Sequence, residues 1–549
     1  MKNLKKGKYV FIFLLLLTIL GGFLRSYKNT ENPISLSIDE VSFGYNAYSI
    51  LKTGRDEYGK FLPLSFKSTG DYKNPVPIYS MVPSIALFGL NEFSIRLPTL
   101  ILATLSIPVF FLFFIEITSS MAISLIATSL LTISPWHIYY SRYVSDHLIA
   151  MFLVILGVIC FLRMIRKGRW FWSVASSIFL SLSLYTYYAE RLFVPLLILS
   201  VFVLNIGVLK KQIKHTILFI LICLIVCAPL IFSTFFGPDR ARAQMTWVGN
   251  DVEFVRNVAV KPLQNIPAIG SENFLLFYFV ARKYLNYFDP AFLFYSGLNL
   301  TKEDSYGLGV LYLFELPFLI AGIIMLFKKN IRNKKLIITW LLIGLIPASL
   351  TNNEQHPGRT FFILPMILLI SAIGAMEFYK FINNYFSRRL KKIIYIIFVS
   401  LVVFNLTQAL LIYTVHFPYQ RGEDFMEGTK ETVLYSLANK HKYKEIVFDP
   451  YRGIEAPYIV SIPHMYILFY ANYDPKIYQE ETKMRVDGSF GFDNFIIRKI
   501  DWREDRFKKD TLFIGSPWSL PEKDIKNEEI LKKIYLSNGA LAFVIVSPN

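Results

Sequence analysis

Cysteine is scarce in this chain, and several patterns that often mark a protein class are missing. Three cysteines occur among 549 residues, and all three, Cys160, Cys223 and Cys227, lie in apolar stretches. Their number and placement predict neither a disulfide framework nor a thiolate metal site. The sequence also has no internal repeat, low-complexity tract, long linker or glycine-rich nucleotide-binding loop. These absences argue against a disulfide-stabilised domain and a repeat architecture.

Apolar residues are abundant instead. The chain is 54% hydrophobic and its mean hydropathy is +0.42, which is too apolar for a soluble protein of this size. Runs of membrane-spanning length recur along most of it, so we predict an all-α polytopic membrane protein. The eleven predicted spans cover residues 9–25, 96–117, 121–139, 143–162, 170–188, 192–209, 215–236, 308–327, 335–350, 360–378 and 393–414.

The net charge of +18 predicts membrane topology and not nucleic-acid binding. Basic residues concentrate in short segments between apolar runs, at 2–8, 163–169, 210–214, 328–335 and 380–392. By the positive-inside rule these segments are cytoplasmic, as is the N-terminus. The first apolar run lacks a small-residue cleavage pattern, so we expect it to remain as a helix.

The remaining loops then fall on the outer face. Two long outer loops are predicted at 26–95 and 237–307, within a membrane domain covering residues 1–414. Inside the first loop, residues 76–90 are apolar and are interpreted as an interfacial helix. A true span there is the alternative, but it would place the later basic clusters outside.

Residues 415–549 change composition and predict a small extracytoplasmic α/β domain. Strand-like runs occur at 445–449, 511–515 and 540–546, and helical stretches are predicted at 427–439 and 525–534.

The stretch SLSIDEVSFGYNAY, residues 35–48, carries the most informative polar residues, Asp39 and Glu40. Placing an Asp at the centre of a membrane helix costs roughly 2.5–3.5 kcal/mol, so the pair belongs at the interface or in a polar cavity. Other unusual polar residues fall on the same predicted side: Asp71, Tyr72, Lys73, His137, Arg142, Asp146, His147, Glu190, Arg191, Glu354, His356 and Arg359. This one-sided mixture predicts a polar cavity that opens to the outside.

Several of these residues also have structural interpretations. Arg96, Trp136, Tyr139 and Tyr140 lie at helix ends, where such side chains often contact lipid headgroups. Arg142 and Asp146 have the spacing of a helical ion pair. Glu190 and Arg191 could satisfy each other within one turn. For Asp39 and Glu40 no neighbour in sequence supplies a neutralising charge.

These motifs give the chain a family resemblance over nearly its whole length. The acidic pair after the first helix is followed by Lys73-Asn-Pro-Val-Pro, FGLNEFSIRLP (88–98), SPWHIYYSRYVSDH (134–147) and HPGRTFFILP (356–365). In order and spacing they resemble the polyprenyl-phosphate-sugar-dependent glycosyltransferases of the GT-C fold. That group includes the protein O-mannosyltransferases of glycosyltransferase family 39 and the lipid A aminoarabinose transferase. The chain departs from this family at two cationic positions. The usual Lys-Pro-Pro is altered after Lys73. The stretch YTYYAERLF replaces a turn that carries a lysine in many relatives, and Arg191 can take the place of that lysine.

The resemblance implies an enzyme that transfers a sugar from a lipid phosphate to an acceptor hydroxyl at the outer face, with inversion. It implies Asp39 as general base, because a hydroxyl becomes a good nucleophile as its proton leaves. Glu40 would orient the acceptor or assist a metal, although one acidic pair does not make a metal site and no cofactor is predicted with certainty. Donor phosphate and sugar would contact Lys73, Arg191, His356, Arg359 and Tyr72. Arg142, Asp146 and Glu190 would support the cavity.

The expected partners are a polyprenyl-phosphate-linked sugar, membrane lipids and a protein, lipid or glycan acceptor. Composition suits a bacterial cytoplasmic membrane.

Two alternatives remain open at this point. A flippase of lipid-linked sugars would also need a polar cavity, but the sequence shows no inverted repeat. An outer-face polysaccharide polymerase or ligase would also use cations, but the acidic pair argues against it.

Overall fold

The structure is a computed structural model of the chain. It describes residues 2–68, 71–237, 246–251, 272–301, 307–352, 355–481, 483–484 and 489–548. Glu354 and much of the predicted outer loop 237–307 lie outside the described residues. The chain divides into two compact units: Met1–Tyr27 with Thr99–Ile412, here called the helical unit, and Lys28–Pro98 with Tyr413–Asn549, here called the mixed unit.

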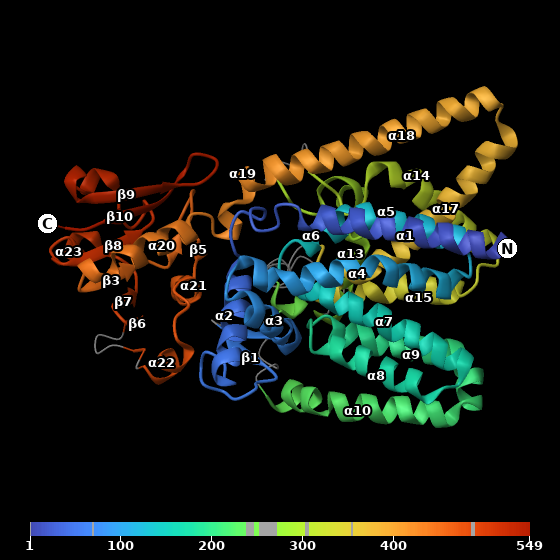
Figure 1. Ribbon diagram of the computed structural model, residues 1–549, viewed down its shortest axis with the longest axis horizontal. Helices are drawn as coiled ribbons and strands as arrows, with labels where there is room; N and C mark the ends of the chain where they lie inside the picture. Colours follow the sequence, from blue (N-terminus) through green and yellow to red (C-terminus); the bar gives the residue numbers. More distant parts are fainter. Residues whose placement is uncertain are drawn as a thin grey trace. The chain divides into compact units, whose positions relative to one another are not determined.

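The helical unit is a bundle of apolar helices. Its helices are α1 (Lys2–Ser26), α5 (Met121–Ile133), α6 (Pro135–Ser141), α7 (Asp146–Lys167), α8 (Trp170–Leu184), α9 (Glu190–Lys211), α10 (Ile213–Phe236), α13 (Glu272–Asn286), α14 (Leu316–Lys328), α15 (Lys334–Gly344), α16 (Ile346–Ser349), α17 (Leu364–Tyr385) and α18 (Arg388–Leu411). Helix α4 (Glu92–Thr118) begins in the mixed unit and continues into this one. Helix α17 packs against α14 and α5, and α8 packs against α7 and α10 (Figure 1).

The apolar helices confirm an all-α polytopic membrane region. Among the described residues, seven helices are long and apolar enough to span a membrane, or eight if the bent pair α5–α6 is one span. The other three predicted spans, 170–188, 308–327 and 335–350, fall on the shorter helices α8, α14 and α15. Helix α15 ends just before α16, which carries Pro347 in its first turn, because proline cannot continue the helical hydrogen-bond ladder.

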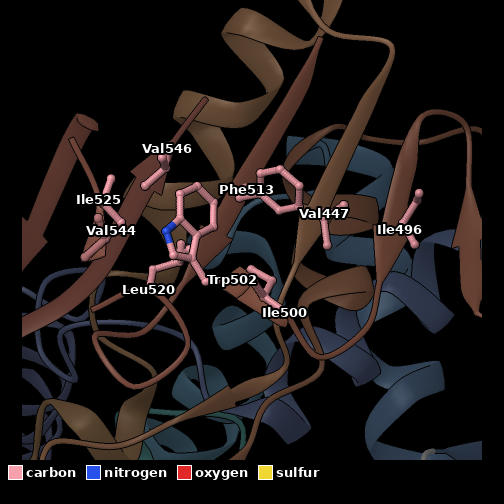
Figure 2. Packing of buried hydrophobic residues seen from close by; sticks show 9 residues of the cluster. All are labelled: Val447, Ile496, Ile500, Trp502, Phe513, Leu520, Ile525, Val544 and Val546. Atoms are coloured by element: carbon pink, nitrogen blue, oxygen red, sulfur yellow. The ribbon is translucent and has the colours of Figure 1, made fainter. Parts of the chain in front are cut away.

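The mixed unit contains a six-stranded sheet with strand order β6-β7-β3-β8-β10-β9. The strands are β3 (Glu445–Phe448), β6 (Phe490–Phe492), β7 (Phe495–Ile497), β8 (Thr511–Gly515), β9 (Ile530–Tyr535) and β10 (Leu541–Val546). Strand β3 is parallel to β7 and β8, whereas β6, β9 and β10 pair antiparallel. Trp502 of the short helix α23 (Trp502–Asp505) lies in an apolar cluster with Val447, Phe513 and Val544 (Figure 2).

This sheet confirms most of the predicted elements. The three predicted strands correspond to β3, β8 and β10, and the predicted helix 427–439 corresponds to α20 (Thr429–Asn439). The predicted helix 525–534 is wrong, because residues 530–535 form edge strand β9 and pair with β10. The sequence ILKKIY has good helix formers, but a neighbouring strand that needs a partner outweighs that weak preference.

The first long loop is also ordered and packs with the C-terminal region. It forms α2 (Ile38–Thr53), the hairpin β1 (Phe66–Ser68) and β2 (Asp71–Lys73), and α3 (Pro75–Phe88). Helix α2 packs against α3 and against α21 (Pro463–Tyr470) and α22 (Pro475–Glu480). Residues 28–98 therefore belong to one unit with residues 413–549. Helix α3 has 14 residues, about 21 Å of helix, which is shorter than a hydrocarbon core of about 30 Å.

Candidate functional site

The acidic pair lies in the first turn of α2. Ser37 is the N-cap: its hydroxyl accepts a hydrogen bond from the Glu40 amide at 3.3 Å, and the Glu40 carboxylate accepts one from the Ser37 amide at 3.0 Å. This reciprocal capping box fixes the start of the helix. Carboxylates in the first turn also interact favourably with the helix dipole. The local sequence therefore explains why two adjacent acids are tolerated here.

Glu40 is buried in an ion pair with Arg96. Its Oε1 accepts from Arg96 Nε at 2.8 Å and its Oε2 from Arg96 Nη2 at 3.1 Å. The same guanidinium donates to the carbonyls of Asn29 and Ser35 at 2.6 and 3.0 Å. Arg96 therefore does not extend to lipid headgroups, as one interpretation of the sequence allowed, because it is nearly inaccessible to solvent. It ties α4 to the segment that precedes α2.

Asp39 has a different environment from its neighbour. Its side chain is 60% exposed, and Lys73 Nζ lies 2.7 Å from Asp39 Oδ1. Lys73 ends strand β2, and its own side chain is only 13% exposed. In the hairpin, Phe66 pairs with Lys73 and Lys67 with Tyr72, so the β1–β2 pairing sets where the ammonium lies. Asp39 is thus an accessible carboxylate with a partly buried cation beside it.

The described residues offer no evident metal centre. Within them, no group of three or more His, Cys, Asp or Glu side chains is arranged to hold a metal ion. Glu40, for which the family resemblance allows a metal-assisting role, has both carboxylate oxygens engaged by Arg96. The three cysteines are all described, and each is a free thiol.

In the helical unit, two of the sequence motifs pack against each other. Trp136 Nε1 donates to the Pro357 carbonyl at 3.1 Å, which joins motif 134–147 to motif 356–365. A Cβ atom at Gly358 would lie 2.4 Å from His147 Nε2 and 2.9 Å from the Tyr140 hydroxyl. Glycine is therefore required at this close approach of backbone to side chains.

Arg142 holds the end of α1. Its Nη1 donates to the Leu24 carbonyl at 3.0 Å and its Nη2 to the Tyr27 carbonyl at 2.5 Å. Such carbonyls at a helix C-terminus otherwise lack intrahelical partners. The helical spacing that suggested an Arg142–Asp146 pair is absent, since α6 ends at Ser141 and α7 begins at Asp146. Arg142 therefore supports the C-terminal end of α1.

Asp146 lies beside a cluster of rings. Its Oδ1 is 2.8 Å from His147 Nδ1 and accepts from the His147 amide at 2.9 Å. The His147 ring lies 4.2 Å from Tyr187 and 6.3 Å from His356, centroid to centroid. Asp146 and His356, predicted separately from the sequence, are thus connected through His147, which the sequence placed on the same side without a role of its own.

Glu190 and Arg191 do not satisfy each other within one turn, which was one of the alternatives that the sequence left open. Both carboxylate oxygens of Glu190 are buried and have no hydrogen-bond partner within the described part of the chain. Arg191 instead lies over the Tyr188 ring, 4.2 Å from its centroid, and its Nη1 is 3.4 Å from Thr234 Oγ1. Adjacent residues at a helix start point in different directions, which explains the failure of the pairing.

Arg359 and Lys283 converge on Thr351. Arg359 Nη1 donates to Thr351 Oγ1 at 2.6 Å, and Lys283 Nζ donates to the Thr351 carbonyl at 3.0 Å. Lys283 also pairs with Asp251 at 2.6 Å. Sequence reasoning missed Lys283, because it lies on α13 within a stretch interpreted as loop. Its position in the amphipathic segment ARKYLNYF is the signal that could have indicated it.

The predicted site residues thus form two groups. Asp39, Glu40, Tyr72 and Lys73 belong to the mixed unit, whereas Arg142, Asp146, Glu190, Arg191, His356 and Arg359 belong to the helical unit. Each group is defined by contacts within its own unit.

Comparison with known proteins gives a family match to part of the chain and a fold. The family model of the dolichyl-phosphate-mannose-protein mannosyltransferases matches residues 15–241, less than half of the chain. A comparison with curated protein sequences finds no match.

Solved structures resemble the chain over most of its length. The crystal structure of ArnT from Cupriavidus metallidurans in the apo state aligns over 98% of both chains, with a TM-score of 0.55 and 11% identity. The same protein bound to undecaprenyl phosphate gives 0.51 over 98% of both chains, again at 11% identity. An Archaeoglobus fulgidus oligosaccharyltransferase in complex with Zn and sulfate gives 0.50 at 12% identity, covering 78% of this chain and 55% of that one. The chain therefore has the GT-C fold that its sequence motifs predicted, and residues 15–241 carry the pattern of the dolichyl-phosphate-mannose-protein mannosyltransferase family.

Proposed function

We propose that this protein is a membrane glycosyltransferase that transfers a sugar from a polyprenyl-phosphate carrier to an acceptor hydroxyl. The family match and the fold support a glycosyltransferase. The similar ArnT structure bound to undecaprenyl phosphate supports a polyprenyl-phosphate carrier. The observation that carries the proposal is the accessible Asp39 carboxylate, fixed at the start of α2 with Lys73 beside it.

Asp39 is the proposed general base. It takes the proton of the acceptor hydroxyl as that oxygen attacks the anomeric carbon of the donor sugar, and the bond from that carbon to the phosphate oxygen breaks. Attack from the face opposite the leaving phosphate inverts the anomeric centre. The exposure of Asp39 lets an acceptor reach its carboxylate, and the capping box at Ser37 keeps the start of α2 in place.

Glu40 has a positioning role in this proposal and not the catalytic role first considered. Its two oxygens are engaged by Arg96, so it is not poised to take a second proton or bind a metal. A fully paired buried charge holds the first turn of α2 in one geometry, and catalysis depends on such preorganisation. The proposed reaction therefore uses one carboxylate and routes no step through a metal ion.

Cations are proposed to hold the departing phosphate. Lys73 lies next to the base, and Arg191, Arg359 and His356 of the helical unit are the further candidates. Charge-assisted hydrogen bonds to phosphate oxygens are among the strongest in proteins, and they stabilise charge as it develops. Lys283 joins this group because it shares Thr351 with Arg359.

The proposed reaction takes place at the outer face of a bacterial cytoplasmic membrane. The basic segments assign the N-terminus to the cytoplasm and the mixed unit to the outside. The carrier's hydrocarbon chain would stay among lipids while its phosphate and sugar reach the site.

A transfer assay tests the proposal. Purified protein is incubated with a panel of radiolabelled polyprenyl-phosphate sugars and a cell-envelope extract, and products are separated from the carrier. We expect label in a new product whose glycosidic linkage has the anomeric configuration opposite to that of the donor. If the label stays on every carrier and the labelled carrier crosses the bilayer of proteoliposomes, the protein is a flippase and the proposed transferase function is wrong.

A further inference from the structure

The mixed unit contains a cavity that the proposed reaction does not use. Its volume is about 430 Å³, within the range of about 300–1,000 Å³ that is usual for small-molecule sites. The segment before α2, the start of α20 and the edge strand β9 supply its lining. The lining residues are Ile34, Ser35, Glu427, Gly428, Lys430, Glu431, Leu434, Tyr435, Lys532 and Tyr535.

Both lysines that line this cavity are paired with carboxylates. Lys532 Nζ pairs with Glu431 at 2.7 Å, and Lys430 Nζ pairs with Glu92 at 2.5 Å. Both ammonium groups therefore already have a carboxylate partner. The two pairs present donors and acceptors side by side. A neutral ligand with many hydroxyl groups fits this arrangement, because each hydroxyl both donates and accepts.

Aromatic rings and an unpartnered hydroxyl complete the lining. Tyr535 is 55% exposed, and Lys532 lies 5.4 Å from the ring centroid of Tyr435. The Ser35 hydroxyl is buried and has no hydrogen-bond partner within the described residues. A buried polar atom without a partner is costly, and a ligand hydroxyl would satisfy it. A pyranose offers such hydroxyls together with C–H faces that pack on aromatic rings.

The cavity wall is connected to the proposed base. The Ser35 carbonyl accepts a hydrogen bond from Arg96 Nη2, the same guanidinium that holds Glu40, and Asp39 precedes Glu40 in the first turn of α2. A sugar bound against Ser35 would therefore contact the segment that fixes the base.

We infer that this cavity is a saccharide-binding subsite and that the acceptor is accordingly a glycan or a glycan-bearing molecule. The inference that the cavity binds a saccharide rests on the chemistry of its lining residues alone. Its assignment to the acceptor rests on the proposed transfer reaction.

Direct binding tests the inference independently of transfer. Full-length fluorescent protein in lipid nanodiscs is applied to an array of immobilised oligosaccharides built from hexoses, N-acetylhexosamines and uronic acids, without lipid or phosphate. We expect wild type to bind a subset of them. Tyr535→Ala should weaken that binding about tenfold or more, since losing an aromatic contact costs of the order of 1.4 kcal/mol. The double variant Glu431→Lys with Lys532→Glu exchanges the two charges and so retains an ion pair. It should also weaken oligosaccharide binding.

Tyr451→Ala is the matched control, because Tyr451 is 40% exposed in the same unit and does not line the cavity. Equal unfolding midpoints of all variants would show that the fold is retained. Absence of wild-type binding across the array, or equal binding by Tyr535→Ala, would overturn the inference. Array binding by a wild type that transfers no sugar would refute the proposed function and uphold the saccharide site.

Discussion

Asp39 and Glu40 are neighbours in sequence, but the fold gives them different chemistry. Glu40 faces Arg96 and is buried, whereas Asp39 is accessible and pairs with Lys73. Both partners are distant in sequence. The sequence indicated that two adjacent acids needed cations, but only the packing of α4 and the β1–β2 hairpin decides which cation meets which acid.

Arg96→Met should destabilise the protein strongly. It leaves the buried Glu40 carboxylate without its cation, and breaking a buried pair in this way costs about 3–5 kcal/mol. The midpoint of thermal unfolding in detergent measures the loss. Adding Glu40→Gln to Arg96→Met should recover part of it, because no buried charge then remains.

Lys28→Met is the control for this loss. It breaks an exposed pair with Glu31, and such pairs contribute about 1 kcal/mol or less. An Arg96→Met protein as stable as Lys28→Met would show that the buried pair does not hold α2.

The buried carboxyl of Glu57 should make the free energy of unfolding depend on pH. It lies between α2 and β1, and burial raises the pKa of its carboxyl from 4.5 to about 7, against an opposing hydrogen bond from Asn46. Because the folded state holds this proton more tightly than the unfolded state, stability should fall as pH rises from about 4.5 to about 7, by up to about 3 kcal/mol. Glu57→Gln should remove this loss.

The measurement is the unfolding midpoint between about pH 5 and pH 8 for both proteins. The wild type should lose more stability over that interval than Glu57→Gln, and the two should be similar at the acidic end. If the unfolding midpoints of the two proteins change with pH in parallel, the pKa of Glu57 is the same in the folded and unfolded states, and the prediction is wrong.

At the scale of elements, α2 depends on close packing. Its face meets α21, and a Cβ atom at Gly44 would lie 2.8 Å from the Phe469 ring and 2.9 Å from Ile95 Cγ2. Glycine at this position lets helix α2 approach its neighbours closely. The sequence pattern did not reveal this contact, because Phe469 lies more than 400 positions further along the chain.

Gly44→Ala should therefore destabilise the protein by about 1–3 kcal/mol, the usual cost of overpacking a tight interface. Gly207→Ala in α9 is the matched control, since its Cβ would meet nothing within 4 Å and alanine is the better helix former. Thermal unfolding compares the two variants. Equal or opposite effects would contradict the close packing assigned to α2.

Long, strongly apolar elements could be predicted from sequence, and boundaries that depend on neighbours could not. Helices such as α7 and α10 follow directly from their composition. The break between α6 and α7, which removes the helical spacing of Arg142 and Asp146, left no comparable signal. Strand β9 differs from the predicted helix because its extended conformation depends on pairing with the next strand, β10, and not on the helix preference of its own residues.

At the scale of the whole molecule, the motifs identified the fold class, but composition did not reveal how the chain divides. Residues 28–98 look like a loop between two apolar helices, yet they pack with residues 413–549 into one unit. The Tyr466 hydroxyl donates to the Leu36 carbonyl at 2.7 Å, just before the first turn that carries Asp39. The C-terminal region therefore supports the segment that positions the proposed base.

Deletion of residues 420–549 should consequently abolish transfer, and not merely change acceptor choice. The deletion removes α21 and α22, so that α2 keeps its contact with α3 but loses its two partners from the C-terminal region. Label transfer and membrane extraction of the truncated protein are measured together. A truncated protein that inserts and still transfers sugar would show that α2 is held without the C-terminal region.

The most direct measurement is transfer by Asp39→Asn in the radiolabelled-donor assay. The account predicts that transfer falls by at least about a hundredfold, the scale of a lost general base, while unfolding midpoint and membrane insertion match wild type. Asp424→Asn, which breaks an exposed pair with Arg421 in the same unit, should transfer like wild type. Full turnover by a well-folded Asp39→Asn protein would contradict the assignment of Asp39 as the base.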